Sequence, residues 1–264
     1  MLFSHNVQQL TVSLQSSRYV FPTVLFSSQS LKDFKLISNT TKTPLDFPAL
    51  TTLNLSCVTL WGDLFSKCIN LKKLTLKYFV VDNVFDIITP RLCNLILKEG
   101  RCSKTINVIA PQLENLRIVN CSIGYLNVSP QLSSFCYTSS YLGCYVPLHF
   151  SNDQFHSLNK VSFCLRKYNP NKAYKEEDVR NTINMLQKLH SARYLTLSAD
   201  TVEYISSFPD LFLHHSSPFS NLVCLTIDSS MRKDVAYKVK MSTEAKNFLL
   251  GNSPSATLIM KLSN

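Results

Sequence analysis

One pattern of leucine spacing recurs along the chain and restricts the folds that the chain can adopt. In each segment an apolar residue is followed by two variable residues, a second apolar residue, one variable residue and a third apolar residue. The ten segments begin at Val7, Leu31, Leu50, Leu71, Leu92, Leu113, Leu132, Leu158, Ala192 and Leu222. Their successive spacings are 24, 19, 21, 21, 21, 19, 26, 34 and 30 residues. Such regularity indicates one structural unit repeated along the chain.

The second half of each segment alternates apolar and variable residues, as in a β-strand with one buried face. A unit of about 21 residues cannot bury its own apolar face, so the units must stack. A period in the low twenties is typical of leucine-rich repeats (LRRs). The pattern therefore predicts an α/β fold, an LRR solenoid with a curved parallel sheet. The returning segments are expected to be short helices or irregular chain on the convex side.

The turns after the strands are expected to be irregular in register. In repeats of this kind an Asn or Cys often stands three residues after the last apolar position and links neighbouring turns. Asn39 and Cys121 occupy that position, but Val58, Phe79 and Gly100 do not provide such a side chain.

The spacing lengthens after about residue 150, and the inserted sequence predicts a helix. Val179, Ile183, Leu186 and His190 fall at helical spacing in KEEDVRNTINMLQKLHS, just after three acidic residues that favour a helix N-terminus. We expect a helix of about four turns that packs on the convex side.

The C-terminal sequence predicts a short helix followed by a strand. The helix lies in STEAKNFLLGNSP, with Ser242 or Thr243 as N-cap and Gly251 as its stop, and the strand lies in SATLIMKLS. We therefore expect a solenoid over residues 1–240, irregular after about residue 150. A capping helix and strand over residues 241–264 should pack on the same domain.

Composition argues against several functional classes. The chain contains only 5 glycines and no glycine-rich phosphate loop. The 9 cysteines form no CxxC pair, which favours reduced, packed thiols. His214 and His215 are adjacent, but no acid or thiol stands near enough in sequence to suggest a metal site. We expect no catalytic activity, no cofactor and no metal.

Neither a signal peptide nor a membrane span is predicted. The N-terminal sequence lacks a basic start and an unbroken apolar block, and no apolar run approaches the roughly 18 residues that a span requires. A cytoplasmic or nuclear location is expected.

The net charge of +10 suggests where a partner would bind. Outward positions of the predicted sheet carry the cations Lys35, Lys73, Lys77, Lys98, Arg117 and Lys160. The acids at equivalent positions are Asp33 and Asp228. We predict a basic stripe on the concave face that receives an acidic segment of a protein partner. The alternative is that these side chains only make the sheet soluble.

A resemblance extends over essentially the whole chain. The runs HNVQQLTVSL, FPALTTLNLSCVTL, CINLKKLTL, APQLENLRI, ARYLTLSADTVEYI, SPFSNLVCLTID and AKNFLLGNSPSATLIM resemble, in the same order, plant F-box/LRR proteins with an FBD-like C-terminal region. In that family an N-terminal F-box docks on the Skp-type adaptor of a cullin ubiquitin ligase, and the repeats hold the target. No residues before His5 could form an F-box, so the chain resembles the substrate-binding half alone.

The resemblance and the pattern together predict a protein–protein recognition module that binds its target on the concave face. A Skp-type adaptor would join only through an F-box upstream. One alternative is a truncated LRR protein without a ligase role, either a competitor or an inactive product. A basic nucleic-acid-binding protein is less favoured, because most aromatic residues occupy apolar positions of the repeat. Without a preceding cap, the first repeat is expected to fray or aggregate.

Overall fold

The computed structural model describes residues 7–13, 28–37, 44–128, 131–140, 148–150, 155–166, 173–213, 215–230 and 238–262. The chain divides into two compact units. The first comprises Met1–Gln131 and Leu148–Ser151, and the second comprises Leu132–Pro147 and Asn152–Asn264.

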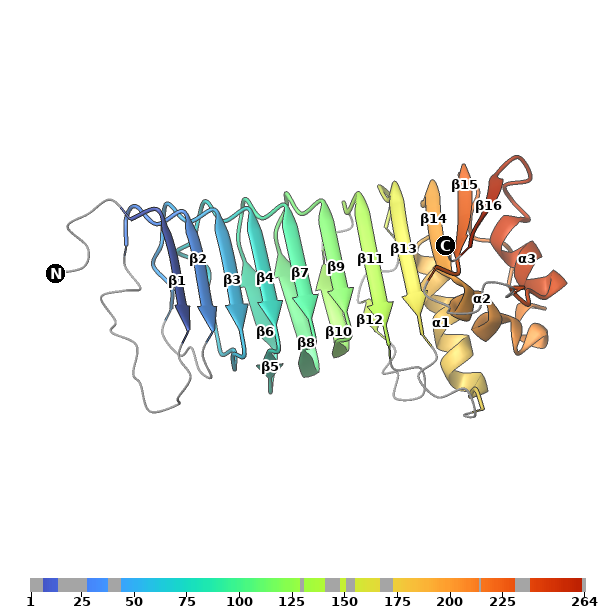
Figure 1. Cartoon of the computed structure of the whole chain (residues 1–264), viewed down its shortest axis with the longest axis horizontal. Coiled ribbons are helices and arrows are strands. Elements are labelled where there is room, and N and C mark those ends of the chain that lie inside the picture. The colour runs from blue at the N-terminus through green and yellow to red at the C-terminus, as the bar shows by residue number, and fades with distance from the viewer. Residues whose placement is uncertain are drawn as a thin grey trace. The chain divides into compact units, whose positions relative to one another are not determined.

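The first unit contains a parallel sheet whose strands follow one another in chain order (Figure 1). Its strands are β1 (Gln9–Ser13), β2 (Asp33–Ile37), β3 (Thr52–Ser56), β4 (Lys73–Lys77), β7 (Asn94–Lys98) and β9 (Asn115–Val119). Each strand coincides with the alternating half of a predicted segment, so the leucine spacing located all of them. The parallel, sequential arrangement expected of stacked repeats is confirmed for this unit.

Register explains why the leucines recur at the same spacing. Leu53 pairs with Leu74, and Leu74 pairs with Leu95, so identical side chains form a row across neighbouring strands. All three leucines are fully buried. Burying one such side chain stabilises the fold by about 1.5–3 kcal/mol, and each strand contributes two of them.

The returning chain of the first unit differs from the prediction, because it forms a second parallel sheet. This sheet contains β5 (Val80–Val81), β6 (Phe85–Ile88), β8 (Arg101–Ile109), β10 (Ser122–Val128) and β12 (His149–Phe150). Its strand order is β12-β10-β8-β5, and β6 also pairs with β8. The expectation of helical or irregular returns is therefore wrong in this unit.

The second sheet forms because the returning segments also alternate apolar and polar residues. Ile106 pairs with Phe85 on one side and with Leu126 on the other, and Leu126 pairs with Phe150. These four side chains are at most 4% exposed. They face the leucine rows of the first sheet, and the core of the unit lies between the two sheets.

The turns after β3, β4, β7 and β9 are regular, which contradicts the expectation of an irregular register. Cys57, Tyr78, Glu99 and Asn120 follow the four strands and have φ of 58°, 51°, 51° and 51°. Backbone groups link these turns: the N–H groups of Cys57, Tyr78 and Glu99 donate to carbonyls one coil later, at 2.8–3.0 Å. A side-chain ladder is not required, because the backbone itself pairs neighbouring coils.

The second unit has a sheet of the same kind but returns through helices. Its strands, all parallel and in chain order, are β11 (Ser134–Ser139), β13 (Lys160–Leu165), β14 (Tyr194–Ser198), β15 (Cys224–Asp228) and β16 (Thr257–Lys261). Its helices are α1 (Glu176–Lys188), α2 (Ala199–Ser206), the 3-10 helix η2 (Pro209–Phe212) and α3 (Thr243–Leu250). The last strand predicted from SATLIMKLS is β16.

The predicted helices are present with small differences. In α1, Val179, Ile183 and Leu186 are fully buried as expected, whereas His190 lies beyond the helix end at Lys188. Ser242 caps α3 by accepting the N–H of Ala245 at 3.1 Å. The sequence analysis missed α2 and η2, although Ser198, which accepts the N–H of Thr201, is a typical N-cap residue.

The change in return explains the change in spacing. A strand advances about 3.3 Å per residue and a helix about 1.5 Å, so a helical return needs roughly twice the residues to cross the same distance. The 21-residue steps occur where the return is a strand, and α1 lies within the longest step, of 34 residues, between Leu158 and Ala192.

Two expectations stay predictions. The expected domain boundary at residue 240 is one of them. Fraying of the first repeat is the other, because residues 1–6 and 14–27 lie outside the described residues, as does Asn39.

Candidate interaction surface

The outward side chains of the first unit's parallel sheet form a surface that we name the open face. It consists of three rows across the strands, set by the register of the sheet. The rows are Gln9, Asp33, Thr52, Lys73, Asn94 and Asn115; Thr11, Lys35, Asn54, Thr75, Ile96 and Arg117; and Ser13, Ile37, Ser56, Lys77, Lys98 and Val119. All of these residues are exposed or half-buried.

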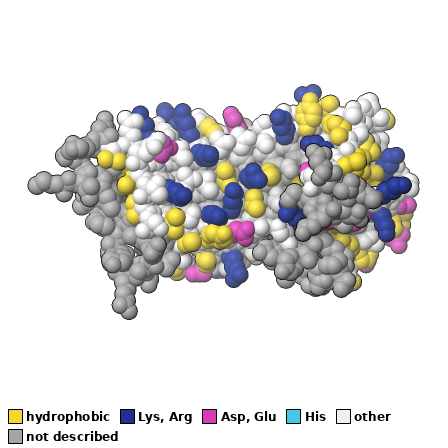
Figure 2. Space-filling view, viewed as in Figure 1, with side chains coloured by type: hydrophobic (Ala, Val, Ile, Leu, Met, Phe, Trp, Pro, Cys, Tyr) yellow, Lys and Arg dark blue, Asp and Glu magenta, His cyan; other side chains and the backbone are white. Residues whose placement is uncertain are grey.

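Five of the six predicted cations lie on the open face, namely Lys35, Lys73, Lys77, Lys98 and Arg117. Figure 2 shows blue Lys and Arg side chains scattered among white polar ones over these strands. The sixth cation, Lys160, is the exposed first residue of β13 in the second unit. The predicted stripe therefore draws its residues from two units.

Within the open face the cations are unevenly spaced. Lys77 and Lys98 are register partners on adjacent strands, so their backbones are about 4.8 Å apart and their side chains leave the same face. We name them the lysine pair. Arg117 is one strand and two residues from Lys98, which places it about 8 Å away. Lys73 and Lys77 are four residues apart on β4, or about 13 Å.

Acidic groups do not neutralise the lysine pair. The two ion pairs recorded among the described residues are Lys67–Asp46 and Arg180–Glu176, and neither involves the open face. The nearest acid in sequence, Glu99, accepts a hydrogen bond from Asn120 at 2.8 Å. Like charges placed opposite each other on neighbouring strands destabilise a sheet, so an anion bound here would relieve a repulsion.

Tyr78 is a surface residue that sequence reasoning missed. It is 51% exposed, and its ring centroid lies 4.7 Å from the Lys77 Nζ. Its left-handed backbone conformation turns the chain at the end of β4. An aromatic ring beside the lysine pair adds apolar contact area to a site that is otherwise polar. The signal that could have found it is the 21-residue period, which aligns Tyr78 with the turn residues Cys57 and Glu99.

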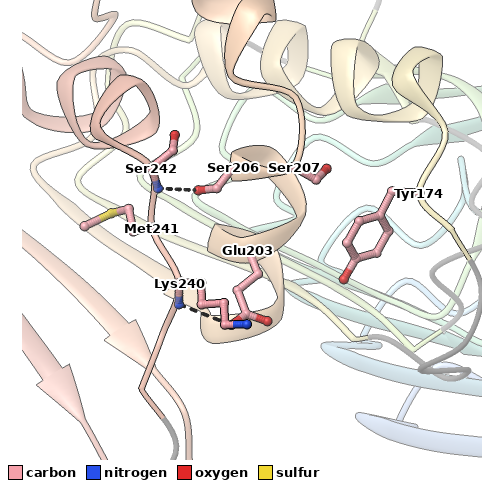
Figure 3. A pocket seen from close by; sticks show the side chains of 7 residues that line it. All are labelled: Tyr174, Glu203, Ser206, Ser207, Lys240, Met241 and Ser242. Atoms are coloured by element: carbon pink, nitrogen blue, oxygen red, sulfur yellow. Dashed lines mark hydrogen bonds between the residues drawn. The ribbon is translucent and has the colours of Figure 1, made fainter.

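A cavity of about 520 Å³ in the second unit is a second candidate site (Figure 3). It is lined by Tyr174, Glu203, Ser206, Ser207, Lys240, Met241 and Ser242. A Glu203 carboxylate oxygen accepts the N–H of Lys240 at 3.2 Å, and the Ser206 hydroxyl accepts the N–H of Ser242 at 3.1 Å. These two side chains join the segment before α3 to α2, so the polar groups of the cavity have a structural use.

The described cysteines are suited to packing rather than to nucleophilic chemistry. All eight of them have free thiols, and Cys57 is the exposed one. Burial raises the pKa of the Cys68 thiol to about 11 and that of Cys121 to about 12. Because thiolate is the reactive form, these two thiols are poor nucleophiles near neutral pH.

The described histidines do not assemble a metal site. Among the residues that the structure describes, no cluster of three His, Cys, Asp or Glu side chains could hold a metal ion. The His156 and His190 rings are 6.3 Å apart, and burial, followed by the charge of His156, lowers the pKa of His190. His215 Nδ1 lies 2.9 Å from Gln187 Nε2, and His214 is outside the described residues.

Helices in the described part of the chain are too short or too polar to cross a membrane. Comparisons with protein-family models, with curated proteins and with solved structures gave no significant match.

Proposed function

We propose that the chain is a protein-recognition module of the leucine-rich-repeat type and that it binds a partner on the open face of its first unit. The observation that carries the proposal is the open face itself, with its ordered polar rows, five cations and one carboxylate, Asp33. Such a surface has a positive potential, which favours an acidic, extended segment of a partner protein.

The repeat architecture supports the LRR assignment. Strands follow one another in parallel at steps of 19 to 21 residues from β2 to β9, with leucine or isoleucine on the inner rows. The second sheet in the returning chain is a departure from the helical returns that the LRR assignment predicts. Because it lies behind the core, it leaves the outward rows of the first sheet in place for binding.

The link to ubiquitin rests on the resemblance described above. By that resemblance the module corresponds to the substrate-binding half of an F-box/LRR subunit of a Skp-cullin-F-box ligase, acting in the cytoplasm or nucleus. Without an F-box the same module would hold its target without delivering it to a ligase. It would then act as a competitor of the full-length receptor, or have no activity of its own.

A charge-reversal experiment tests the binding surface. The double variant Lys77→Glu, Lys98→Glu removes the lysine pair, and Arg101→Glu, Lys104→Glu makes the same charge change on β8 of the second sheet. Both control residues are exposed. The probe is a fluorescein-labelled poly-glutamate peptide, and anisotropy is measured at several salt concentrations. We expect the first double variant to lose about tenfold or more in affinity and the control to lose much less.

Equal losses in the two variants would show that the peptide responds only to net charge and would remove the open-face proposal. Labelled single-stranded and duplex oligonucleotides are measured in parallel. Tighter, steeply salt-dependent binding to these would favour the nucleic-acid alternative instead. Co-purification with a Skp-type adaptor tests the ligase link separately.

A further inference from the structure

Strand β16 forms an exposed apolar edge of the second unit's sheet. It is the outermost strand in the order β11-β13-β14-β15-β16 of the described residues. Leu258 and Met260 pair with Leu225 and Ile227, which are fully buried core residues. Yet Leu258 is 38% and Met260 is 44% exposed, because no described strand covers the inner row on the far side of β16.

The backbone of β16 can accept one more strand. The N–H of Thr257 donates to Val223 O, and Lys261 O accepts the N–H of Ser229, both at 2.9 Å. In a β-ladder the peptide groups of alternate residues point to opposite neighbours. The N–H and C=O groups of Leu258 and Met260 therefore point away from β15, toward the open edge.

We propose that β16 pairs antiparallel with β16 of a second copy of this chain, about a two-fold axis at Ile259. This interaction is independent of the function proposed for the open face. In an antiparallel ladder, residues that exchange both hydrogen bonds alternate with residues that exchange none. With the axis at Ile259, Leu258 exchanges both bonds with Met260 of the second copy, and the two Ile259 residues form the non-hydrogen-bonded pair between them.

Side chains in this register are complementary. Opposed residues share a face, so the exposed Leu258 and Met260 of each copy cover those of the other on the inner row. Thr257 lies opposite the single charged residue of the strand, Lys261, and like charges do not meet. Leu262, which is 61% exposed, falls opposite Ala256. A two-fold interface requires the same patch to fit itself, and this strand meets that requirement in backbone pattern, apolar row and charge.

Sedimentation velocity of the full chain over a range of concentrations tests the proposal. The wild type is expected to move from 30.0 kDa toward twice that mass as concentration rises. Ile259→Lys places like charges on the axis and should give a monomer at all concentrations. Tyr194→Lys is the matched control, since Tyr194 and Ile259 are both 42% exposed and Tyr194 is two strands from the edge. This control should dimerise as the wild type does.

Cross-linking tests the register. In the proposed pair the two Ile259 Cα atoms are about 4.5 Å apart, within reach of a disulfide. The two Thr257 Cα atoms are four residues out of step, about 13 Å apart. Under mild oxidation Ile259→Cys should give a covalent dimer above the wild-type background, and Thr257→Cys should not. A monomeric wild type, an open-ended series of larger masses, equal behaviour of the two lysine variants or equal cross-linking at both positions would each overturn the proposal.

Discussion

Gly100 is the position at which the fold should be least tolerant of a single added methyl group. A Cβ on Gly100 would stand 2.1, 2.2 and 2.5 Å from three ring atoms of Phe79, whose side chain is 1% exposed. Carbon atoms pack at about 3.5–4.0 Å, so the ring would have to move by more than about 1 Å within a filled core. Gly100 lies one coil after Phe79, and the ring occupies the space that a side chain at position 100 would need.

The expected cost of Gly100→Ala follows from two opposing terms. Adding a methyl group to a well-packed core costs about 1–3 kcal/mol and occasionally more. At a position free of clashes, replacing glycine by alanine instead stabilises by about 0.4–1 kcal/mol, through the entropy of the unfolded chain. The steric term wins here, because Phe79 has little free volume around it. We expect the free energy of unfolding in urea to fall by about 1–2 kcal/mol.

A double-mutant cycle separates this clash from a general loss of packing. Phe79→Leu removes part of the ring, so Gly100→Ala should cost less in its presence than in the wild type, with a coupling energy of about 1 kcal/mol or more. Phe85→Leu is the matched control, since Phe85 is equally buried but is not among the nearest atoms to Gly100. The reasoning is refuted if Gly100→Ala is neutral or stabilising, or if it is equally additive with both leucine variants.

Two further predictions concern single coils. Cys57→Gly relieves a left-handed backbone at φ 58° and should raise the free energy of unfolding by about 0.5–1 kcal/mol, whereas Ser56→Gly, in β3, should lower it by about as much; equal losses in urea unfolding would contradict this. Alkylation mapped by mass spectrometry at pH 8 should label the exposed Cys57 quickly and Cys68 and Cys121 slowly, because burial holds their pKa at about 11 and about 12. Since folding favours these two thiols in the protonated form, their contribution to stability is complete below pH 8 and declines as pH rises from about 9 to 12.

Leucine spacing predicted the strands of both parallel sheets, because every repeat exposes the same two positions to the core. The second sheet of the first unit escaped prediction for a physical reason. Segments such as KTINVIA alternate apolar and polar residues over a short distance without the leucine pattern, and short alternation alone does not distinguish a strand from an irregular return. Its pairing with neighbouring returns depends on the register that the first sheet imposes.

The lysine pair could have been predicted more sharply than the basic stripe was. Residues 77 and 98 differ by 21, the local period, so the sequence already places them side by side once the repeat is fixed. The same arithmetic shows that Lys35 and Arg117 share a row but are separated by the three strands that carry Asn54, Thr75 and Ile96. Spacing within the repeat therefore predicts which charges are neighbours, whereas counting cations per face does not.

Burial at β16 shows where a repeat-by-repeat prediction fails. The alternation of Leu258 and Met260 is the same as that of Leu225 and Ile227, so the sequence assigns both pairs to the core. A side chain on the inner row is covered from two sides, by the coils before and after it, and one repeat contains no information about whether both are present. The exposed inner row of β16 is thus a property of the array, and self-association is the property that it predicts.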